Sequence, residues 1–241
     1  MSRFDQHISE LSKAIELNPR HAEAYSNRGN AYEAKGHYDL AIADFNKALE
    51  INPEYTKVYC NRGVAYAKKG QHDQAIADFN KALEINPRHG KAYYNRGVAY
   101  TKKGKYDLAI SDFSKALEIN PGDTEVYNSR GAACRAKGQY DLAISDYSKA
   151  LEINPSYGKA YYNRGNAYTE KGQYDLAIAD YNKALKIKPR FAEAYCNRGV
   201  TYYHMGEYDK AWEDVRKAQS LGLQVPADFL KDLRKASGRE R

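Results

Sequence analysis

Apolar residues recur along this chain at three- and four-residue spacing, the spacing of one face of an amphipathic helix. The clearest case is the segment Ala-Ile-x-Asp-Phe/Tyr-x-Lys-Ala-Leu, which first appears at 41–49 and returns four more times. An Asn-Pro or Lys-Pro pair follows each copy, and a residue that precedes proline resists helical backbone angles. The pattern therefore predicts a series of helices that each end just before a proline.

The pattern has a fixed period of 34 residues, which is typical of stacked helical repeats. The tripeptide Asn-Arg-Gly follows the same period, except that Ser129 replaces asparagine in one copy. With Ala22 as repeat position 1, the chain contains six repeats: 22–55, 56–89, 90–123, 124–157, 158–191 and 192–225. Residues 4–21 match only the second half of a repeat, and residues 226–241 depart from it.

Each repeat is predicted to contain two helices. The first spans positions 2 to 14 and ends at a glycine, whose left-handed backbone suits the end of a helix. These glycines are Gly36, Gly70, Gly104, Gly138, Gly172 and Gly206. The second helix begins near position 18, where an aspartate is expected to cap the free N–H groups. These aspartates are Asp39, Asp73, Asp107, Asp141, Asp175 and Asp209.

With these positions in place, the chain resembles the tetratricopeptide repeat family over nearly its whole length. The match comprises an aromatic residue at positions 4 and 24, glycine at 8, tyrosine at 11, alanine at 20 and 27 and proline at 32, with few exceptions. The resemblance implies an all-α fold, a right-handed superhelical solenoid of antiparallel helix pairs whose first helices line the concave side. Small residues at 8 and 20 allow the helices to cross closely, so most of the 23 tyrosines are predicted to belong to the core.

Position 7 departs from the family, which usually has leucine there. All six repeats have arginine at position 7 and aspartate at position 23 of the second helix. A partly buried guanidinium needs a carboxylate, so the sequence predicts an Arg–Asp bridge in every repeat. The alternative is a row of ligand-binding arginines. The pairs are Arg28 and Asp44, Arg62 and Asp78, Arg96 and Asp112, Arg130 and Asp146, Arg164 and Asp180, and Arg198 and Asp214.

Composition excludes several classes of protein. No apolar run is long enough for a membrane span, and residues 1–5 lack the apolar stretch of a signal peptide. Cys60, Cys134 and Cys196 form no CxxC pair, so free thiols in a reducing, cytoplasmic compartment are expected. The net charge of +7 is spread over interleaved acidic and basic residues, which favours a solvated surface over a nucleic-acid face.

The residues that could carry catalysis do not cluster. The six histidines stand at scattered repeat positions without an HExxH motif, and no Ser/His/Asp set converges. We therefore expect no enzyme activity, no cofactor and no metal site.

Binding capacity is predicted on the first helices, where positions 2, 5, 6, 9, 12 and 13 lie opposite the packed positions 4, 8 and 11. Asparagine recurs at position 6, and an amide can donate to and accept from a peptide backbone at once. The ladder looks like the one that lines the repeat domain of O-linked N-acetylglucosamine transferase. The alternative is an asparagine satisfied within its own helix pair. The predicted peptide-binding residues are Asn27, Asn61, Asn95, Asn163, Asn197, Asn30, Asn166, Lys57, Lys91, Lys102, Tyr94 and Tyr162.

Chaperone-binding members of the family hold a peptide's terminal carboxylate with five side chains. Repeats 1 to 3 supply three of these residues, Asn30, Asn61 and Lys91. Ser26 replaces a lysine of the clamp and Asn95 replaces its arginine. A chaperone clamp is therefore not expected.

The sequence thus predicts a scaffold that binds a protein or an extended peptide in the groove, with the lysines favouring acidic residues in that partner. One alternative is a helical repeat that binds single-stranded RNA. Another is the repeat module of a larger enzyme, because the sequence begins halfway through a repeat. No membrane partner is expected.

The two ends carry separate expectations. Residues 226–241 are predicted to form a capping helix and a basic tail, with Pro226 in its first turn and Phe229, Leu230 and Leu233 on one apolar face. Residues 4–17 should form a helix of the second type that packs through Ile8, Leu11, Ala14 and Ile15 near Tyr25 and Tyr32. Phe4 would leave apolar surface open there, so either weak self-association through this end or fraying of the first helix is expected.

Overall fold

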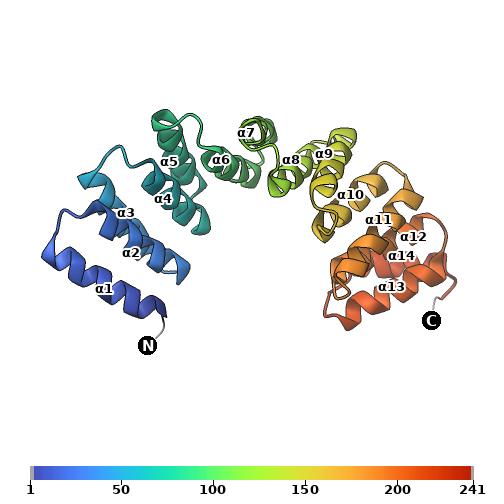
Figure 1. The fold of residues 1–241 in the computed structure, drawn as a ribbon. Helices are drawn as coiled ribbons and strands as arrows, with labels where there is room; N and C mark the ends of the chain where they lie inside the picture. Colours follow the sequence, from blue (N-terminus) through green and yellow to red (C-terminus); the bar gives the residue numbers. More distant parts are fainter. Residues whose placement is uncertain (1–2, 240–241) are drawn as a thin grey trace. The chain divides into compact units, whose positions relative to one another are not determined.

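The computed structural model describes residues 3–239, which contain fourteen α-helices and no strand within that range (Figure 1). The chain divides into two compact units, Met1–Pro121 and Gly122–Arg241. The N-terminal unit contains α1 Arg3–Leu17, α2 Ala22–Ala34, α3 Tyr38–Ile51, α4 Thr56–Lys68, α5 His72–Ile85, α6 Gly90–Lys102 and α7 Tyr106–Ile119. The C-terminal unit contains α8 Thr124–Ala136, α9 Tyr140–Ile153, α10 Gly158–Glu170, α11 Tyr174–Ile187, α12 Ala192–His204, α13 Tyr208–Ser220 and α14 Ala227–Ala236.

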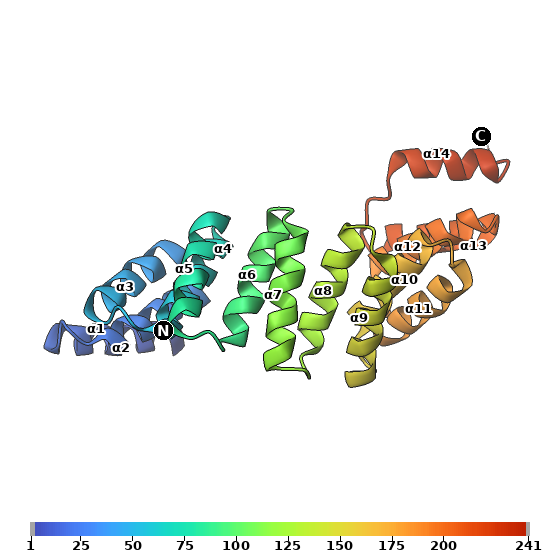
Figure 2. The same ribbon diagram turned by 90° about the horizontal axis from the view of Figure 1, so that it is seen from above.

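Within each unit the helices pack in chain order. The two helices of a repeat contact each other, and each second helix also contacts the first helix of the following repeat, as α3 contacts α4 and α9 contacts α10. First helices also touch one another, α2 with α4 and α4 with α6, then α8 with α10 and α10 with α12. Each unit therefore has a layer of first helices and a layer of second helices, and Figure 2 shows the same succession from above.

The turns between helices confirm one prediction and contradict another. The six predicted glycines have φ between 69° and 78°, the left-handed region that glycine adopts freely. The predicted aspartate caps are wrong. The second helices begin at position 17, and residues such as His37 stand at their N-caps without a side-chain hydrogen bond. In each repeat the aspartate is the second residue of the helix, and in several repeats its carboxylate instead forms an ion pair with a lysine of the following repeat. These pairs are Asp5–Lys35, Asp39–Lys69, Asp73–Lys103 and Asp141–Lys171.

Close contact between the two helices of a repeat explains the glycine at position 8. A Cβ atom on Gly97 would lie 2.8 Å from Cε1 of Phe113, whose ring is buried at position 24. The other repeats that have an aromatic ring at position 24 show the same approach within 0.2 Å. Tyr147 and Tyr181 are fully buried in this position, and the other tyrosines are partly buried. The prediction that tyrosines belong to the core is confirmed.

The predicted Arg–Asp bridge forms in all six repeats, with Nε and Nη2 of each arginine donating to the two carboxylate oxygens. In Arg96 both distances to Asp112 are 2.7 Å, and the pairing raises the pKa of Arg96. Nη1 of Arg96 also donates to Asn80 of the preceding second helix at 2.6 Å. The arginines therefore join consecutive repeats as well as the two helices of one repeat, and they do not form a ligand-binding row.

The two ends of the array differ in their packing. In the C-terminal unit, Leu233 of α14 is completely buried against α13, and Phe229 and Leu230 pack beside it. The prediction that Pro226 lies in the first turn of α14 is wrong, because its ψ of 131° places it at the N-cap. In the N-terminal unit α1 packs on α2 with Ile15 buried, whereas Phe4 is 48% exposed.

Candidate functional site: the first-helix face

The first helices of the N-terminal unit bring seven of the twelve predicted peptide-binding residues to the walls of two cavities. The polar cavity has a volume of about 590 Å³ and is lined by Asn30, Glu33, Lys57, Cys60, Asn61, Val64, His89, Lys91 and Asn95. The apolar cavity has a volume of about 280 Å³ and is lined by Val64, Ala67, Lys68, His72, Phe79, Tyr94, Asn95, Val98, Ala99 and Lys102. The two cavities adjoin, because both are lined by Val64 and Asn95. Asn27 lines neither of them.

The asparagines are bonded to one another across neighbouring first helices. Asn61 Nδ2 donates to Asn30 Oδ1 at 2.7 Å, and Asn197 Nδ2 donates to Asn166 Oδ1 at 2.8 Å. In each case position 6 of one repeat donates to position 9 of the repeat before it. The alternative of an asparagine satisfied within its own helix pair is therefore wrong for Asn61 and Asn197, the two position-6 residues. The recurrence of asparagine at positions 6 and 9 was the available signal for this contact.

Asn95 lacks such a partner, because position 9 of the preceding repeat is Val64. Its Nδ2 atom is buried and makes no hydrogen bond within the described part of the chain. A buried donor without an acceptor costs free energy comparable to a lost hydrogen bond. Asn95 is therefore a buried amide of this face with unused hydrogen-bonding capacity, and it lines both cavities.

Amides of the C-terminal unit are engaged more fully. Asn163 Nδ2 donates to Asn128 Oδ1 at 2.8 Å. Asn166 accepts from Asn197 and, at 2.8 Å, from the hydroxyl of Tyr181, while Asn197 also donates to the hydroxyl of Tyr162 at 3.0 Å. These bonds stabilise the packing of α10, α11 and α12, and they leave fewer donors for a ligand.

Position 5 does not belong to the open stripe that the helical spacing predicted. Ser26, Cys60, Asn128 and Cys196 stand at this position and are buried. The tyrosines there are half-buried. The ring of Tyr94 lies 5.9 Å from that of Phe113, and the ring of Tyr162 lies 4.7 Å from that of Phe191. In the N-terminal unit, the first-helix face therefore comprises positions 2, 6, 9, 12 and 13 of the first helices.

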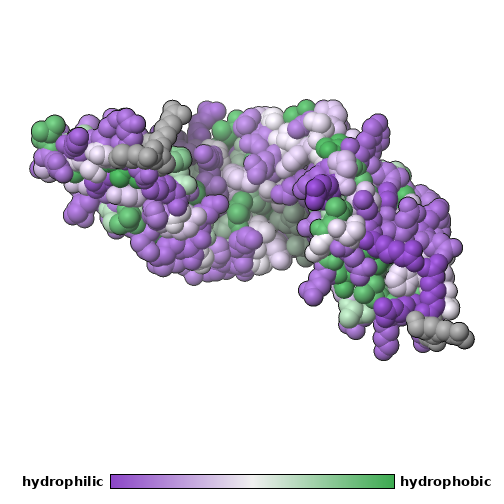
Figure 3. All heavy atoms as spheres, turned by 90° about the horizontal axis from the view of Figure 1, so that it is seen from below, coloured by the Kyte–Doolittle hydropathy of each residue, from purple (hydrophilic) through white to green (hydrophobic). Residues whose placement is uncertain are grey.

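The charge of the two cavities is positive. Within residues 3–239, none of Lys57, Lys68, Lys91 and Lys102 forms an ion pair, and Glu33 is the one carboxylate among the lining residues described. The lysines at position 14, by contrast, are paired with aspartates. Hydrophilic side chains cover much of the surface in Figure 3, with apolar residues scattered among them. The lysines of the cavities are thus available to an anionic ligand.

Cys60 and His89 form the inner wall of the polar cavity. Nδ1 of His89 accepts a hydrogen bond from the backbone N–H of Ala92 at 3.2 Å, and its Nε2 lies 3.9 Å from Sγ of Cys60. Burial raises the pKa of the Cys60 thiol to about 11, so the thiol is protonated at neutral pH. A protonated, buried thiol is a poor nucleophile. All three cysteines are buried and unbridged.

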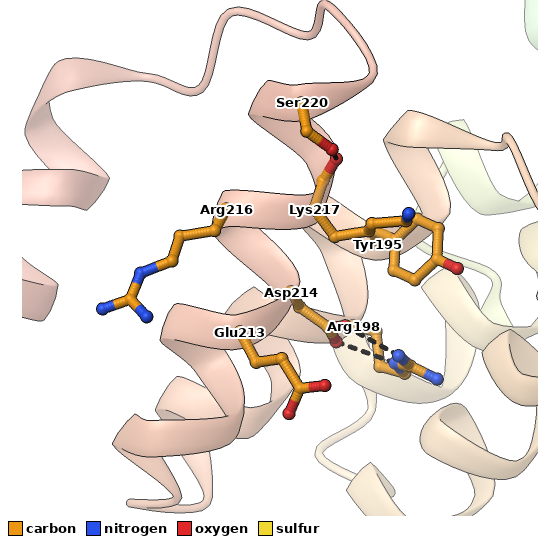
Figure 4. A pocket seen from close by; sticks show the side chains of 7 residues that line it. All are labelled: Tyr195, Arg198, Glu213, Asp214, Arg216, Lys217 and Ser220. Carbon is orange, nitrogen blue, oxygen red and sulfur yellow. Dashed lines mark hydrogen bonds and ion pairs between the residues drawn. The ribbon is translucent and has the colours of Figure 1, made fainter.

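Another cavity, of about 590 Å³, lies in the C-terminal unit between α12 and α13 (Figure 4). Arg198 on its wall is bonded to Asp214, while Arg216 points away from this pair. Arg216 occupies position 25, where Asn182 and Ser148 of earlier repeats accept from the next arginine. No pattern in the sequence predicted a site here.

The described residues contain neither a membrane-spanning helix nor a cluster of metal ligands. No helix among residues 3–239 is long and apolar enough to cross a membrane. In the same range, no group of three or more histidine, cysteine and carboxylate side chains could hold a metal ion. The fold and the face together define a helical-repeat protein whose first helices carry a polar surface with open cavities in the N-terminal unit.

Comparison with family models identifies the repeat. A model described as TPR repeat matches residues 2–36, 131–170 and 165–206, and a model described as tetratricopeptide repeat matches 22–55, 56–89 and 90–123. Two further tetratricopeptide models match 113–145 and 192–221. The chain belongs to the tetratricopeptide repeat family. All four matching models describe a repeat, and none describes a catalytic domain.

Solved structures agree with this assignment. The crystal structure of YrrB, described as a TPR protein with an unusual peptide-binding site, is 30% identical over 76% of this chain and 95% of YrrB, with a TM-score of 0.65. A tetratricopeptide repeat protein from Parabacteroides merdae is 25% identical over 96% of this chain and 91% of its own, with a TM-score of 0.70. MamA is 28% identical over 68% and 96%, with a TM-score of 0.64. No curated protein sequence matches the chain significantly.

Proposed function

We propose that this protein is an interaction scaffold that binds an extended peptide segment of a partner on its first-helix face. The observation that carries the proposal is the polar cavity of the N-terminal unit, where Asn30, Asn61 and Asn95 stand with Lys57 and Lys91. Asparagine amides bind a peptide backbone whatever its side chains, and the unpaired lysines favour acidic residues in the partner. The similarity to YrrB, which is described as having a peptide-binding site, supports the same function.

Selection from a random-sequence peptide library tests the proposal. We expect the full chain to enrich peptides, and an Asn61→Ala/Asn95→Ala/Asn163→Ala variant to bind the enriched peptides more weakly. The melting temperature of that variant shows whether its fold is retained. A chain that enriches no peptide under conditions in which it is folded contradicts the proposed function.

RNA binding is the competing outcome. Binding of single-stranded RNA depends on contacts with phosphates, so its affinity falls steeply with salt, whereas peptide binding through amides changes less. Measuring the affinity for a random RNA pool and for an enriched peptide at low and high ionic strength separates the two. Tight, salt-sensitive RNA binding without peptide binding would favour the RNA reader.

The buried, unbridged thiols also support a proposal on location, since such cysteines are typical of a reducing compartment such as the cytoplasm. Fusion of the chain to a fluorescent protein tests it.

Weak self-association through α1 remains a separate proposal. Phe4 is exposed and lines a cavity of about 540 Å³ together with Gln6, His7 and Glu10. An exposed aromatic residue beside a hollow suits contact with a second copy. Sedimentation of the full chain over a range of concentrations, with Phe4→Ser as the matched variant, tests it. A monomer at every concentration would rule the contact out.

A further inference from the structure

The apolar cavity of the N-terminal unit is lined at two positions by side chains that are smaller than their equivalents in the other repeats. Position 12 is Ala67 where the other repeats have Glu, Thr, Arg or Tyr, and position 17 is His72 where they have tyrosine. The equivalent space is filled in repeats 5 and 6. There Tyr174, at position 17, stacks on His204 at 5.7 Å, and His204 corresponds to Lys102 of the cavity.

The walls of this cavity suit one large apolar side chain. Val64, Phe79 and Val98 form an apolar lining, and a volume of about 280 Å³ is too small for a folded element. Lys68 and Lys102, which also line the cavity, are exposed and unpaired in residues 3–239. An apolar side chain that enters here would therefore stand among positive charges.

Asn95 joins this cavity to the polar one. Its buried N–H has no acceptor because Val64 faces it where Asn30 faces Asn61. The χ2 torsion of asparagine has broad minima, so the side-chain amide of Asn95 can rotate. This rotation would turn its N–H toward a ligand without breaking a hydrogen bond of that N–H. Asn61 would lose its bond to Asn30 in the same rotation. A ligand carbonyl therefore gains more at Asn95 than at Asn61.

We infer that the N-terminal unit selects a peptide segment in which an acidic residue stands two positions from a large apolar residue. The apolar side chain occupies the cavity beside Phe79, the carboxylate pairs with Lys57 and Lys91, and Asn95 binds the backbone between them. Side chains of an extended peptide point the same way at every second residue, so both can enter the adjoining cavities. This inference rests on the proposed peptide-binding function and names the partner's chemistry.

The repeats themselves supply variants that keep the fold. Val64→Asn places at position 9 the residue that repeats 1 and 5 already have, and it gives Asn95 a hydrogen-bond acceptor. His72→Tyr restores the tyrosine of the other repeats at position 17 and fills the cavity. Val200→Asn makes the same change at position 9 of repeat 6, outside both cavities, and is the matched control.

The experiment uses the full chain, a random-sequence peptide library and the best enriched peptide with two analogues. In one analogue an amide replaces the acidic side chain, and in the other alanine replaces the apolar residue. We expect enriched peptides to carry the acidic–apolar pair and each analogue to bind about tenfold more weakly, the effect of one lost charged contact or buried side chain. Val64→Asn and His72→Tyr should each weaken binding by about tenfold, and Val200→Asn by less than about twofold.

The outcomes distinguish this inference from the function on which it rests. A folded chain that enriches no peptide overturns both. Peptides that bind but lack the acidic–apolar pair overturn the inference alone. Folded Val64→Asn and His72→Tyr variants that bind the best peptide as tightly as Val200→Asn does also overturn it, because the ligand then does not use these cavities. Melting curves of the three variants identify any loss that comes from unfolding.

Discussion

The N-terminal and C-terminal units are built from the same repeat but use their first helices differently. Both contain the Arg–Asp pairs and the close contact between the glycine at position 8 and the residue at position 24. In the C-terminal unit Asn166 receives two hydrogen bonds, and Tyr162 contacts Phe191. In the N-terminal unit Asn95 has a free donor, and cavities open beside it.

The difference shows which residues the fold requires. The arginine at position 7 recurs because it bonds to the aspartate of its own helix pair and reaches the repeat before it, as Arg96 does. The glycine at position 8 recurs because the side chain opposite leaves no room for a Cβ atom. Positions 9, 12 and 17 differ between repeats because either a larger side chain or an open space is compatible with the packing. A single replacement there, such as Val64 for asparagine, leaves the amide of Asn95 without the acceptor that Asn61 and Asn197 have.

The largest expected effect concerns the frame that both units share. Asp112→Leu should lower the free energy of unfolding by about 3–4 kcal/mol, because it leaves Arg96 partly buried without its carboxylate. Arg96→Leu with Asp112→Leu should cost much less, since removing both charges can be near neutral. Asp180→Leu should resemble Asp112→Leu. Urea denaturation of these variants and the wild type measures this, and equal losses for the single and double variants would show that the two residues are not coupled.

A change in the cap should affect one unit and not the other. Leu233→Ala should destabilise the C-terminal unit by about 2–3 kcal/mol, because Leu233 is completely buried against α13. Hydrogen exchange should become faster in α12 and α13 and stay unchanged in α2 and α4. Deletion of residues 226–241 should lower the melting temperature further. The exposed Lys231→Ala is the control, and unchanged exchange in Leu233→Ala would contradict a stabilising role for α14.

The amides offer the most direct test of the comparison. Asn166→Ala should cost about 2 kcal/mol, because it removes the buried acceptor of the Tyr181 hydroxyl and one of the two acceptors of the Asn197 amide. Asn95→Ala should leave stability nearly unchanged, since its Nδ2 has no partner to lose, and should weaken binding of the enriched peptide. Thermal melting of both variants measures the two changes in stability. If Asn95→Ala destabilises the chain as much as Asn166→Ala, the two faces do not differ as described.

The smallest effect is a loss of stability at alkaline pH. Burial raises the pKa of Cys60 from 9.0 to about 11, so the folded chain binds the thiol proton more tightly than the unfolded chain. The stabilisation from this raised pKa is fully present below pH 9 and is lost as the pH rises toward 11. At pH 10 the loss of stability amounts to about 1 kcal/mol. Cys60→Ala should therefore lose less stability than the wild type between pH 8 and pH 10.

Cys196 stands at the same repeat position in the C-terminal unit, and burial raises the pKa of its thiol as well. Cys196→Ala is thus the matched variant from the C-terminal unit. Tyrosine ionisation affects the wild type, Cys60→Ala and Cys196→Ala alike. Identical pH profiles for the wild type and Cys60→Ala would mean that the thiol is not desolvated.

The sequence by itself determined the helix pairs, the period, the Arg–Asp partners and the glycine turns. Each of these depends on residues at fixed spacing, and the period repeats the evidence six times. It did not determine that the aspartate at position 18 pairs with the next repeat instead of capping its helix, because that contact joins residues about 30 positions apart across two helices.

The tertiary structure alone decided which amides are engaged and which are free. Asn61, Asn95 and Asn163 occupy the same repeat position, yet their contacts differ. Asn61 donates to position 9 of the preceding repeat, Asn163 donates to position 5 of the preceding repeat, and Asn95 has no acceptor. The side chain opposite each of them belongs to the neighbouring repeat. Its distance and direction depend on how the first helices pack, and a helical period describes one helix and not the space between two.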